Sequence, residues 1–366
     1  MEEKVGWDKS VSDVNDGILI AVDKPHPTYY LALTIAFICM VIFFTSWGIL
    51  VTYGMGLTGL NSPVYWGVCI TNFVFWVGIG HAGTLISAIL FLFRAKWRNS
   101  INRSAEAMTV FAVITAGLFP LIHVGRIWYA PYWMAPLPTT SNLWVNFRSP
   151  LVWDIFAIST YLTVSLLFWY MGLVPDIASM RDRVRGFKRL IFNVLSFGWV
   201  GTLRQWHHYE AGYGFLAALA TPLVLSVHSI VSWDFAMALQ PGWHTTIFPP
   251  YFVAGAILSG CAMVYVIVLP LRRMLQLEGF IRHEHLDALL RLTLLTSTIV
   301  AYAYSIEFFV AWYSGNLYER AVFINRAFGD YGWSYWCMIF CNVVFPQVFW
   351  FKKLRTSIAF TFVLSI

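Results

Sequence analysis

The chain has 366 residues and a formal net charge of +6, with 59% hydrophobic, 18% aromatic and only 11% charged residues. Soluble globular proteins carry about 25% charged residues, so this composition excludes a soluble enzyme and an intrinsically disordered chain. The apolar residues come in long unbroken runs, which disfavours the short alternating segments of a membrane β-barrel. The composition is therefore typical of a polytopic α-helical membrane protein.

Eight apolar runs are long enough to cross the hydrocarbon core of a bilayer, which takes about 20 residues of helix. We expect spans near residues 29–53, 65–93, 107–129, 151–174, 210–232, 250–271, 288–312 and 331–351. A partial ninth span begins near residue 356 and is cut off at Ile366, so we expect the natural chain to continue. Residues 1–28 are polar and contain no apolar signal-peptide core, which leaves a single membrane domain over residues 29–366.

Two pairs of these spans are weakly similar in sequence pattern. Spans two and three are joined by a basic turn that ends in Glu106, and spans six and seven are joined by a similar turn with Glu284. Both pairs start on the same side of the membrane, as in a parallel repeat. We therefore expect an all-α fold of two four-helix bundles, spans two to five and six to nine, with a peripheral first helix.

Positive charge is distributed unevenly between the two sides of these spans. Twenty of the 24 Lys and Arg residues lie in the N-terminal segment and in the segments 94–106, 175–209, 272–291 and 352–355. The alternate loops contain the other four. The positive-inside rule then predicts a cytoplasmic N-terminus, with the sparsely charged loops facing the periplasm or exterior.

The cysteines give no sign of a metal or haem site. All five lie in apolar runs without a CxxC or CxxCH motif, so we expect no thiolate metal site, no iron–sulfur cluster and no covalently attached haem in this chain. No predicted span contains two histidines, which argues against a b-type haem.

Seven ionisable side chains fall within the predicted spans or at their ends, where a charge costs at least about 2.5 kcal/mol. The predicted topology places six of them near the outer ends of the spans and only His81 near the middle. They are His81, His123, Arg126, Asp154, His228, Asp234 and Glu307. Because costly groups that share one depth favour a common site, we predict a functional site near the outer face.

Oxidation of a lipid-soluble quinol fits this set of residues. An imidazole can accept a hydroxyl proton, and a neighbouring carboxylate can orient the ring and take the proton onward. We therefore predict that His123 and Asp154 are catalytic and that they bind the quinol together with Arg126 and Tyr129, which lie on the helix face of His123. The predicted proton relay comprises His81, His228, Asp234 and Glu307. Because no side chain here accepts electrons, the redox centre must belong to a partner.

The same residues also have structural roles to consider. His123 and Arg126 could form a pair at the membrane interface, and Asp154, His228 and Asp234 could stabilise helix ends. His81 could pack against a neighbouring helix, and Glu307 could form an ion pair. The function of the whole chain has two further alternatives. It could be a proton or ion translocator lined by His81, His123 and Glu307, or an anchoring subunit without a quinol site.

Three segments resemble a known family. They are Phe119–Tyr129 (FPLIHVGRIWY), Trp144–Tyr161 (WVNFRSPLVWDIFAISTY) and Leu166–Ala178 (LLFWYMGLVPDIA). They are similar to the membrane subunits of the polysulfide reductase (NrfD-like) family, and within it to the ActC type of bacterial alternative complex III. The related ActF type is the nearest alternative.

The resemblance implies a multi-pass, haem-free subunit of the bacterial inner membrane, built from two four-helix bundles. It implies a respiratory or photosynthetic complex in which menaquinol is oxidised near the periplasmic face. Electrons would pass to a docked iron–sulfur subunit and then to c-type haem subunits, beside a paralogous membrane subunit, with proton translocation as an accompanying activity. The proposed quinol residues of the family fall on His123 and Asp154.

Overall fold

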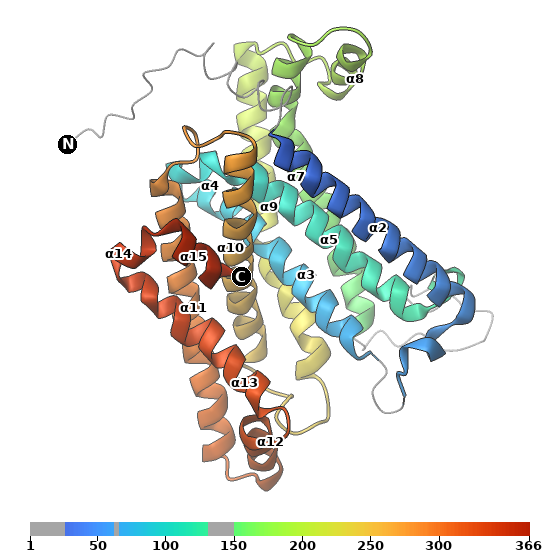
Figure 1. Ribbon diagram of the computed structural model, residues 1–366, viewed down its shortest axis with the longest axis vertical. Helices are drawn as coiled ribbons and strands as arrows, with labels where there is room; N and C mark the ends of the chain where they lie inside the picture. Colours follow the sequence, from blue (N-terminus) through green and yellow to red (C-terminus); the bar gives the residue numbers. More distant parts are fainter. Residues whose placement is uncertain (1–25, 62–65, 131–149) are drawn as a thin grey trace.

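The computed structural model describes residues 26–61, 66–130 and 150–366, and over these ranges the chain folds almost entirely into helices (Figure 1). Seven helical stretches are long and apolar enough to cross a membrane. This confirms the predicted all-helical, polytopic fold. The seven stretches are α2 (Pro27–Tyr53), the composite span Val68–Leu92, α5 (Asn102–Val124), α7 (Pro150–Arg181), α9 (Leu203–Ala236), α10 (Phe248–Met274) and α11 (His283–Tyr313).

The second span changes its helix type along its length. It begins as α3 (Val68–Thr84), continues as the π-helical turn η2 (Leu85–Ile89) and ends as α4 (Leu90–Leu92). A π-helical turn inside an α-helix often accompanies a functional site. Here the turn contains Ser87, which is buried inside the bundle.

The predicted eighth and ninth spans are also helical but interrupted. The eighth runs through α13 (Gly332–Ile339), the π-helical η5 (Phe340–Val344) and the 3₁₀-helical η6 (Phe345–Trp350). The ninth is represented by α14 (Lys352–Arg355) and α15 (Ile358–Ser365). The remaining helices are short: η1 (Met55–Thr58), η3 (Lys96–Ser100), η4 (Ile127–Tyr129), α8 (Phe187–Leu195) and α12 (Leu317–Phe328).

The first four-helix bundle consists of α3, α5, α7 and α9. Neighbouring helices in the chain pack against each other, and α9 closes the bundle by packing on α3 and η2. Apolar side chains from all four helices meet in the centre, among them Val77, Val113, Tyr161 and Val227. This arrangement agrees with the predicted unit of spans two to five.

The second group of helices packs on the first through α10. α10 contacts α3, α9 and α11, while α11 contacts η5 and η6 and α15 contacts α10. One cluster of buried side chains runs through both groups and includes Ile86, Tyr265, Leu289 and Phe349. The two groups of helices therefore share one hydrophobic core and pack directly against each other.

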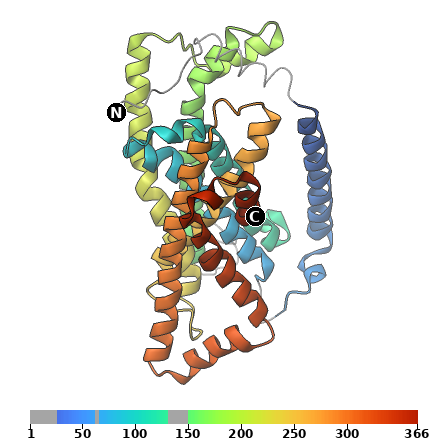
Figure 2. The ribbon, with the colours of Figure 1, turned by 60° about the vertical axis from the view of Figure 1, so that its left-hand side comes forward.

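α2 lies outside both groups, as predicted for the first helix. It contains no buried residue, and Figure 2 shows it standing apart from the other helices. The backbone N–H of His26, just before α2, donates to the carbonyl of Met274 at the end of α10 (3.3 Å). Residues 1–25 of the polar N-terminal segment lie outside the described part of the chain.

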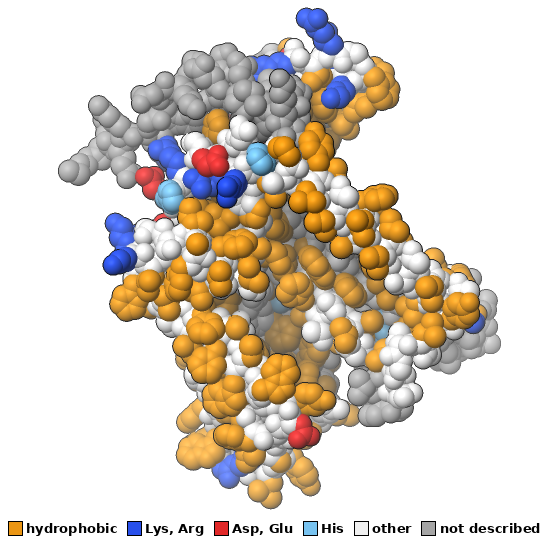
Figure 3. Space-filling model, in the orientation of Figure 1, with side chains coloured by type: hydrophobic (Ala, Val, Ile, Leu, Met, Phe, Trp, Pro, Cys, Tyr) orange, Lys and Arg blue, Asp and Glu red, His pale blue; other side chains and the backbone are white. Residues whose placement is uncertain are grey.

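The outer surface is strongly apolar. Hydrophobic side chains cover most of the face in Figure 3, and Lys and Arg gather toward its upper end. Phe37, Phe111 and Leu295 are 60%, 62% and 58% exposed. Contiguous apolar surface of this extent is typical of contact with lipid.

The two ends of the first bundle differ in charge. We call the end at which α5 begins and α7 ends the basic end, because Arg98, Arg103 and Arg181 lie there. The other end, at which α5 ends and α7 begins, is called the opposite end. α3 begins and α9 ends at the opposite end as well, since neighbouring helices of the bundle are antiparallel.

Several helices extend beyond the predicted spans. α5 begins at Asn102, where the hydropathy pattern places the start of the span at residue 107, and α9 covers residues 203–236 instead of 210–232. The apolar run stops at the first charged residues, but the backbone hydrogen bonds of a helix do not require apolar side chains. As a result, Glu106 lies inside a helix of the bundle.

Small residues allow α3 to approach its neighbours closely. A Cβ atom at Gly83 would collide with Thr109 Oγ1 and with the carbonyl oxygen of Ala105 on α5. At Gly260 of α10, a Cβ atom would collide with Ala82 Cβ on α3. Membrane helices commonly pack through such small residues, because van der Waals contact replaces the hydrophobic effect as the driving force.

Candidate functional site

The opposite end of the first bundle brings together residues from four helix ends. Trp66 precedes α3, and its ring stacks on the ring of His123 near the end of α5, with centroids 3.6 Å apart and planes 12° apart. The Nδ1 atom of His123 is buried and has no hydrogen-bond partner within the described part of the chain. The stack fixes the plane of the imidazole and leaves one ring nitrogen available to a ligand.

Two carboxyl groups meet at the same end. Asp154, in the first turns of α7, lies close enough to Asp234, near the end of α9, for the two carboxyl groups to influence each other electrostatically. Beside them the rings of Trp153 and Trp233 pack edge to face, with centroids 5.8 Å apart. Among the residues that the structure describes, none of the four carboxyl oxygens has a hydrogen-bond partner. Two neighbouring carboxylates without a cation repel each other, so both cannot be ionised at low cost.

The other two predicted quinol ligands lie just past the end of α5. Arg126 is exposed and precedes η4. Tyr129, the last residue of η4, is 43% exposed. Both residues are therefore at the opposite end, the end that contains His123 and Asp154. Their role in binding, like the catalytic role of His123 and Asp154, stays a prediction.

The structure places His81 and His228 together in the middle of the bundle. Their ring centroids are 4.6 Å apart, and both side chains are almost fully buried. The expected position of His228 near the outer face is wrong, because α9 continues to Ala236 and leaves His228 two turns inside its end. Asp234 is separated from it by six residues, or about 9 Å along the helix.

His81 has two further contacts. Its Nδ1 is 2.5 Å from the carbonyl oxygen of Val77 on the same helix. Its ring centroid lies 5.1 Å from that of Tyr161 on α7. The hydroxyl of Tyr161 is hydrogen-bonded to Thr84 Oγ1 at 2.7 Å. His81 is thus both a packing residue and part of a group of buried polar side chains.

Glu307 lies outside the first bundle. Its Oε1 accepts a hydrogen bond from Nη1 of Arg326 on α12 at 3.1 Å, which also makes an ion pair. The Glu307 side chain is 8% exposed, whereas that of Arg326 is 38% exposed. Of the two roles considered for Glu307, the ion pair is the one that the structure shows.

Removing the cation of this pair tests that role. The Arg326→Met variant leaves the buried Glu307 carboxylate without its donor, and loss of a hydrogen bond to a buried charged group costs about 1–3 kcal/mol. We expect a lower midpoint of thermal unfolding for the purified protein and recovery in the double variant Arg326→Met/Glu307→Met. A single variant as stable as the wild type would contradict a stabilising ion pair.

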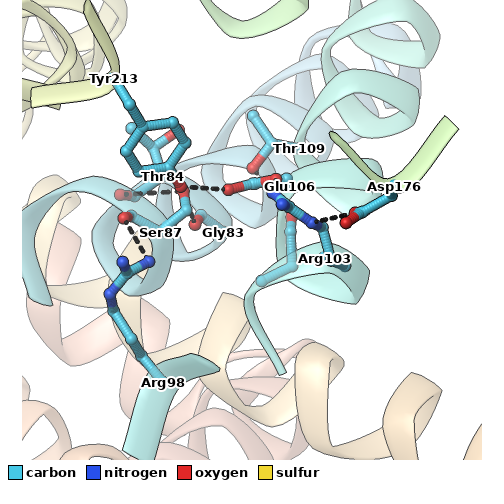
Figure 4. Close-up of polar contacts among 10 residues, drawn as sticks. Gly83, Thr84, Ser87, Arg98, Arg103, Glu106, Thr109, Asp176 and Tyr213 are labelled. Carbon is cyan, nitrogen blue, oxygen red and sulfur yellow. Dashed lines mark hydrogen bonds and ion pairs between the residues drawn. The ribbon is translucent and has the colours of Figure 1, made fainter. Parts of the chain in front are cut away.

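The structure contains a second polar cluster, at the basic end, whose residues were not among the predicted site residues. Glu106 accepts a hydrogen bond from the Tyr213 hydroxyl (2.7 Å) and from Arg103 Nη1 (3.1 Å), and its side chain is 1% exposed. Arg103 Nε also donates to Asp176 Oδ2 at 2.9 Å (Figure 4). Because the hydropathy pattern starts the span at 107, it assigns Glu106 to a loop. The spacing of Arg103 and Glu106, three residues apart, was the available sign of a helix here.

The described residues contain no group of three or more His, Cys, Asp or Glu side chains that could hold a metal ion. Cys337 and Cys341 lie one turn apart, with sulfur atoms separated by 4.0 Å. At the opposite end an imidazole nitrogen and two carboxyl groups lie beside tryptophan rings and are unpaired among the residues that the structure describes. Such groups can accept and donate protons.

Comparison with known proteins identifies relatives of this chain. The chain is 26% identical over 230 residues to a Halobacterium salinarum protein named as the membrane subunit of a dimethyl sulfoxide reductase, a match that covers 62% of this chain and 48% of that protein. It is 22% identical over 294 residues to a selenate reductase subunit of Mesobacillus selenatarsenatis, covering 77% and 65% of the two chains. It is also 22% identical over 304 residues to the Hdr-like menaquinol oxidoreductase integral membrane subunit of Archaeoglobus fulgidus, covering 80% and 64%.

The matched regions thus span about half to two thirds of the length of these relatives. The family model described as polysulphide reductase, NrfD, matches residues 56–366, which include both helical groups and leave out α2. The chain therefore belongs to the NrfD family of polysulphide reductase membrane subunits.

Proposed function

We propose that this chain is the quinol-binding membrane subunit of an oxidoreductase complex and that menaquinol is oxidised at the opposite end of its first bundle. The observation that supports the site is a set of buried polar atoms on His123, Asp154 and Asp234 that have no partner within the described ranges of the chain. A buried polar atom without a partner costs free energy unless a ligand pairs with it. A relative that is named as a menaquinol oxidoreductase subunit supports the choice of substrate.

The residues offer a proton acceptor for each of the two hydroxyl groups of a quinol. The Nδ1 atom of His123 can accept the proton of one hydroxyl group, and the carboxyl pair of Asp154 and Asp234 can accept the proton of the other. Trp66 holds the imidazole in place. Oxidation of one quinol releases two protons and two electrons, and the electrons must leave for a redox centre on another subunit.

The partners and the orientation follow as parts of the same proposal. The uneven distribution of Lys and Arg favours a cytoplasmic basic end and a periplasmic opposite end in a bacterial inner membrane. An iron–sulfur subunit docked at the opposite end would then be within reach of the quinol. It would pass electrons to c-type haem subunits, as in an alternative complex III of the ActC type with its paralogous membrane subunit.

A binding measurement on the purified chain tests the quinol site without requiring its partners. A fluorescent hydroxyquinoline N-oxide imitates the quinol ring, and its fluorescence is quenched when it binds. We expect the wild type to bind it and the His123→Leu variant to bind at least about tenfold more weakly, the effect of about 1.4 kcal/mol. The loss of one hydrogen bond in a buried site accounts for a change of this size.

The matched control is His244→Leu, because His244 is an exposed histidine in the loop between α9 and α10, at the same end of the molecule. Its affinity should equal that of the wild type. A wild type that does not bind the probe, or a His123→Leu variant with unchanged affinity, would favour an anchoring subunit without its own quinol site.

A further inference from the structure

The chain between α7 and α9 contains a short helix with an exposed apolar face. Four apolar side chains of α8 follow one another at intervals of three, one and three residues, which places them on one side of the helix. They are Phe187, Leu190, Ile191 and Val194, and they are 76%, 60%, 41% and 67% exposed. Within the described ranges of the chain, nothing covers this face.

The remainder of the α8 region is basic. Residues 181–189 include five Lys or Arg side chains and a single acidic one, Asp182, which pairs with Arg181 at 2.9 Å. Among the residues that the structure describes, the other four basic side chains form no ion pair: Arg183, Arg185, Lys188 and Arg189. In Figure 3 hydrophobic side chains at α8 lie toward the apolar surface of the bundle, and Lys and Arg side chains lie above them. The region thus combines an apolar face with uncompensated positive charge.

Hydrogen bonds hold α8 at the end of α7. The hydroxyl of Tyr170 on α7 donates to the carbonyl oxygen of Leu195 at 2.6 Å. Nη1 of Arg181, the last residue of α7, donates to Oγ of the buried Ser196 at 3.0 Å. These contacts involve the end of α8 and not its apolar side chains. The helix is therefore fixed in one position while its apolar face stays free.

The lengths of α7 and α9 place α8 at the level of the lipid headgroups. The two helices have 32 and 34 residues, or about 48 and 51 Å at the rise of an α-helix. The hydrocarbon core of a bilayer is about 30 Å thick, and the whole bilayer with its headgroups is about 40–45 Å thick. Both helices therefore extend beyond the hydrocarbon core. Figure 1 shows α8 between them at the basic end, beyond the ends of α2 and α5.

Aromatic residues next to α8 support this level. The rings of Trp199, Trp206 and Tyr209 pack against one another, with centroids between 5.0 and 5.6 Å apart. Trp and Tyr are enriched where the hydrocarbon core meets the headgroups. An apolar helix face beside several basic residues is also the usual pattern of a helix that lies on an anionic membrane surface. The core of a protein interface, in contrast, is depleted of charged residues. Charge and level together therefore favour a lipid surface as the occupant of this face.

We propose that the α8 region binds anionic phospholipids of the leaflet at the basic end. The apolar face of α8 enters the boundary between headgroups and acyl chains, and the four unpaired basic side chains contact lipid phosphate groups. Phosphatidylglycerol has the required chemistry, because it carries a negative charge that phosphatidylcholine lacks. The quinol site lies at the other end of the bundle, so this proposal does not depend on quinol binding.

Hydrogen–deuterium exchange of the full-length protein tests this proposal one peptide at a time. The protein is placed in lipid nanodiscs of phosphatidylcholine alone or of equal parts of phosphatidylcholine and phosphatidylglycerol, and exchange is followed by mass spectrometry. We expect the amides of α8 to exchange at least about tenfold more slowly in discs with phosphatidylglycerol. Each basic residue near an anionic surface contributes about fivefold to binding, and a bound helix opens less often. The amides of α12, a short helix with acidic and basic residues at the opposite end, should exchange equally in both kinds of disc.

Two matched variants separate the α8 region from the total charge of the protein. The first removes the four unpaired charges: Arg183→Gln/Arg185→Gln/Lys188→Gln/Arg189→Gln. Its α8 should exchange at the same rate in both kinds of disc. The second removes four exposed basic residues outside α8: Arg94→Gln/Arg273→Gln/Lys352→Gln/Lys353→Gln. It should keep the slower exchange that phosphatidylglycerol causes in the wild type.

A smaller variant decides the outcome if the first fourfold variant does not give monodisperse protein. Arg183→Gln/Arg185→Gln leaves α8 itself unchanged and should reduce the effect of phosphatidylglycerol at least about threefold. Equal exchange of wild-type α8 in both kinds of disc would overturn the proposal. An undiminished effect of phosphatidylglycerol in the deciding variant would overturn it as well, and the apolar face would then be left to a protein partner.

Discussion

Replacing Asp154 with asparagine is expected to lower menaquinol-dependent electron transfer about 100-fold or more. Asparagine has nearly the same shape, but it cannot accept a proton from the quinol, and it removes one member of the pair with Asp234. The measurement is the rate at which a short-tailed menaquinol reduces the redox centres of the complex, purified through a tag on this chain. Asp154→Glu, which keeps the carboxyl group, should recover part of the rate.

The control for this variant is Asp330→Asn. Asp330 is an exposed carboxylate between α12 and α13, at the same end of the molecule but outside the first bundle. Its replacement should leave the rate unchanged. Full activity in Asp154→Asn would mean that the carboxyl pair has no part in quinol oxidation.

A single methyl group at Gly83 is expected to disturb the packing of the first bundle. The Cβ atom of Gly83→Ala would collide with Thr109 Oγ1 and the carbonyl oxygen of Ala105, which belongs to the backbone of α5 and cannot move aside by itself. Overpacking of a tightly packed core costs about 1–3 kcal/mol. We expect a lower midpoint of thermal unfolding and less monodisperse protein in size-exclusion chromatography.

Gly117→Ala provides a matched comparison for this effect. Gly117 lies within α5, and a Cβ atom there would meet no atom within 4 Å. Alanine favours a helix over glycine by about 1 kcal/mol, so this variant should be at least as stable as the wild type. Equal stability of Gly83→Ala and Gly117→Ala would show that the close approach of α3 and α5 does not limit stability.

The helices themselves were predictable from hydropathy, because a bilayer imposes one length and one polarity on every span. The limits of α2 and α10 differ from the predicted ones by only a few residues. Helix ends that carry charged residues were not predictable in this way. The start of α5 at Asn102 is the clearest example. Hydropathy assigns Glu106 to a loop, whereas in the structure Glu106 lies inside α5 and is a buried hydrogen-bond partner of Tyr213.

The pairing of site residues depends on information that hydropathy does not contain. Asp154 and Asp234 are 80 residues apart in the sequence, and their contact requires the axial position of α7 relative to α9. The same holds for the stack of Trp66 on His123. The depth of a residue in the membrane can be estimated from the limits of its own helix. The predicted position of His228 was wrong because the end of α9 was placed at residue 232 instead of 236.

The site residues that could be predicted are ionisable ones, because burying an ionisable side chain in a membrane costs free energy and the residue type can be read from the sequence. His123, Asp154 and Asp234 stand out as ionisable groups in apolar surroundings, and the structure places all three at the opposite end of the first bundle. Trp66 and Tyr213 could not be distinguished from the many other aromatic residues of this chain. Only their contacts, with His123 and with Glu106, give them significance.

Photolabelling by a quinone tests the central claim most directly. An azido-substituted menaquinone analogue is added to the complex in lipid vesicles, activated by light and located by mass spectrometry of the peptides. The account predicts labelling of peptides that contain Trp66, His123 or Asp154, and loss of this labelling when excess menaquinone competes. Labelling that is confined to the basic end around Arg98–Glu106, or to α10 and α11, would contradict a quinol site at the opposite end of the first bundle.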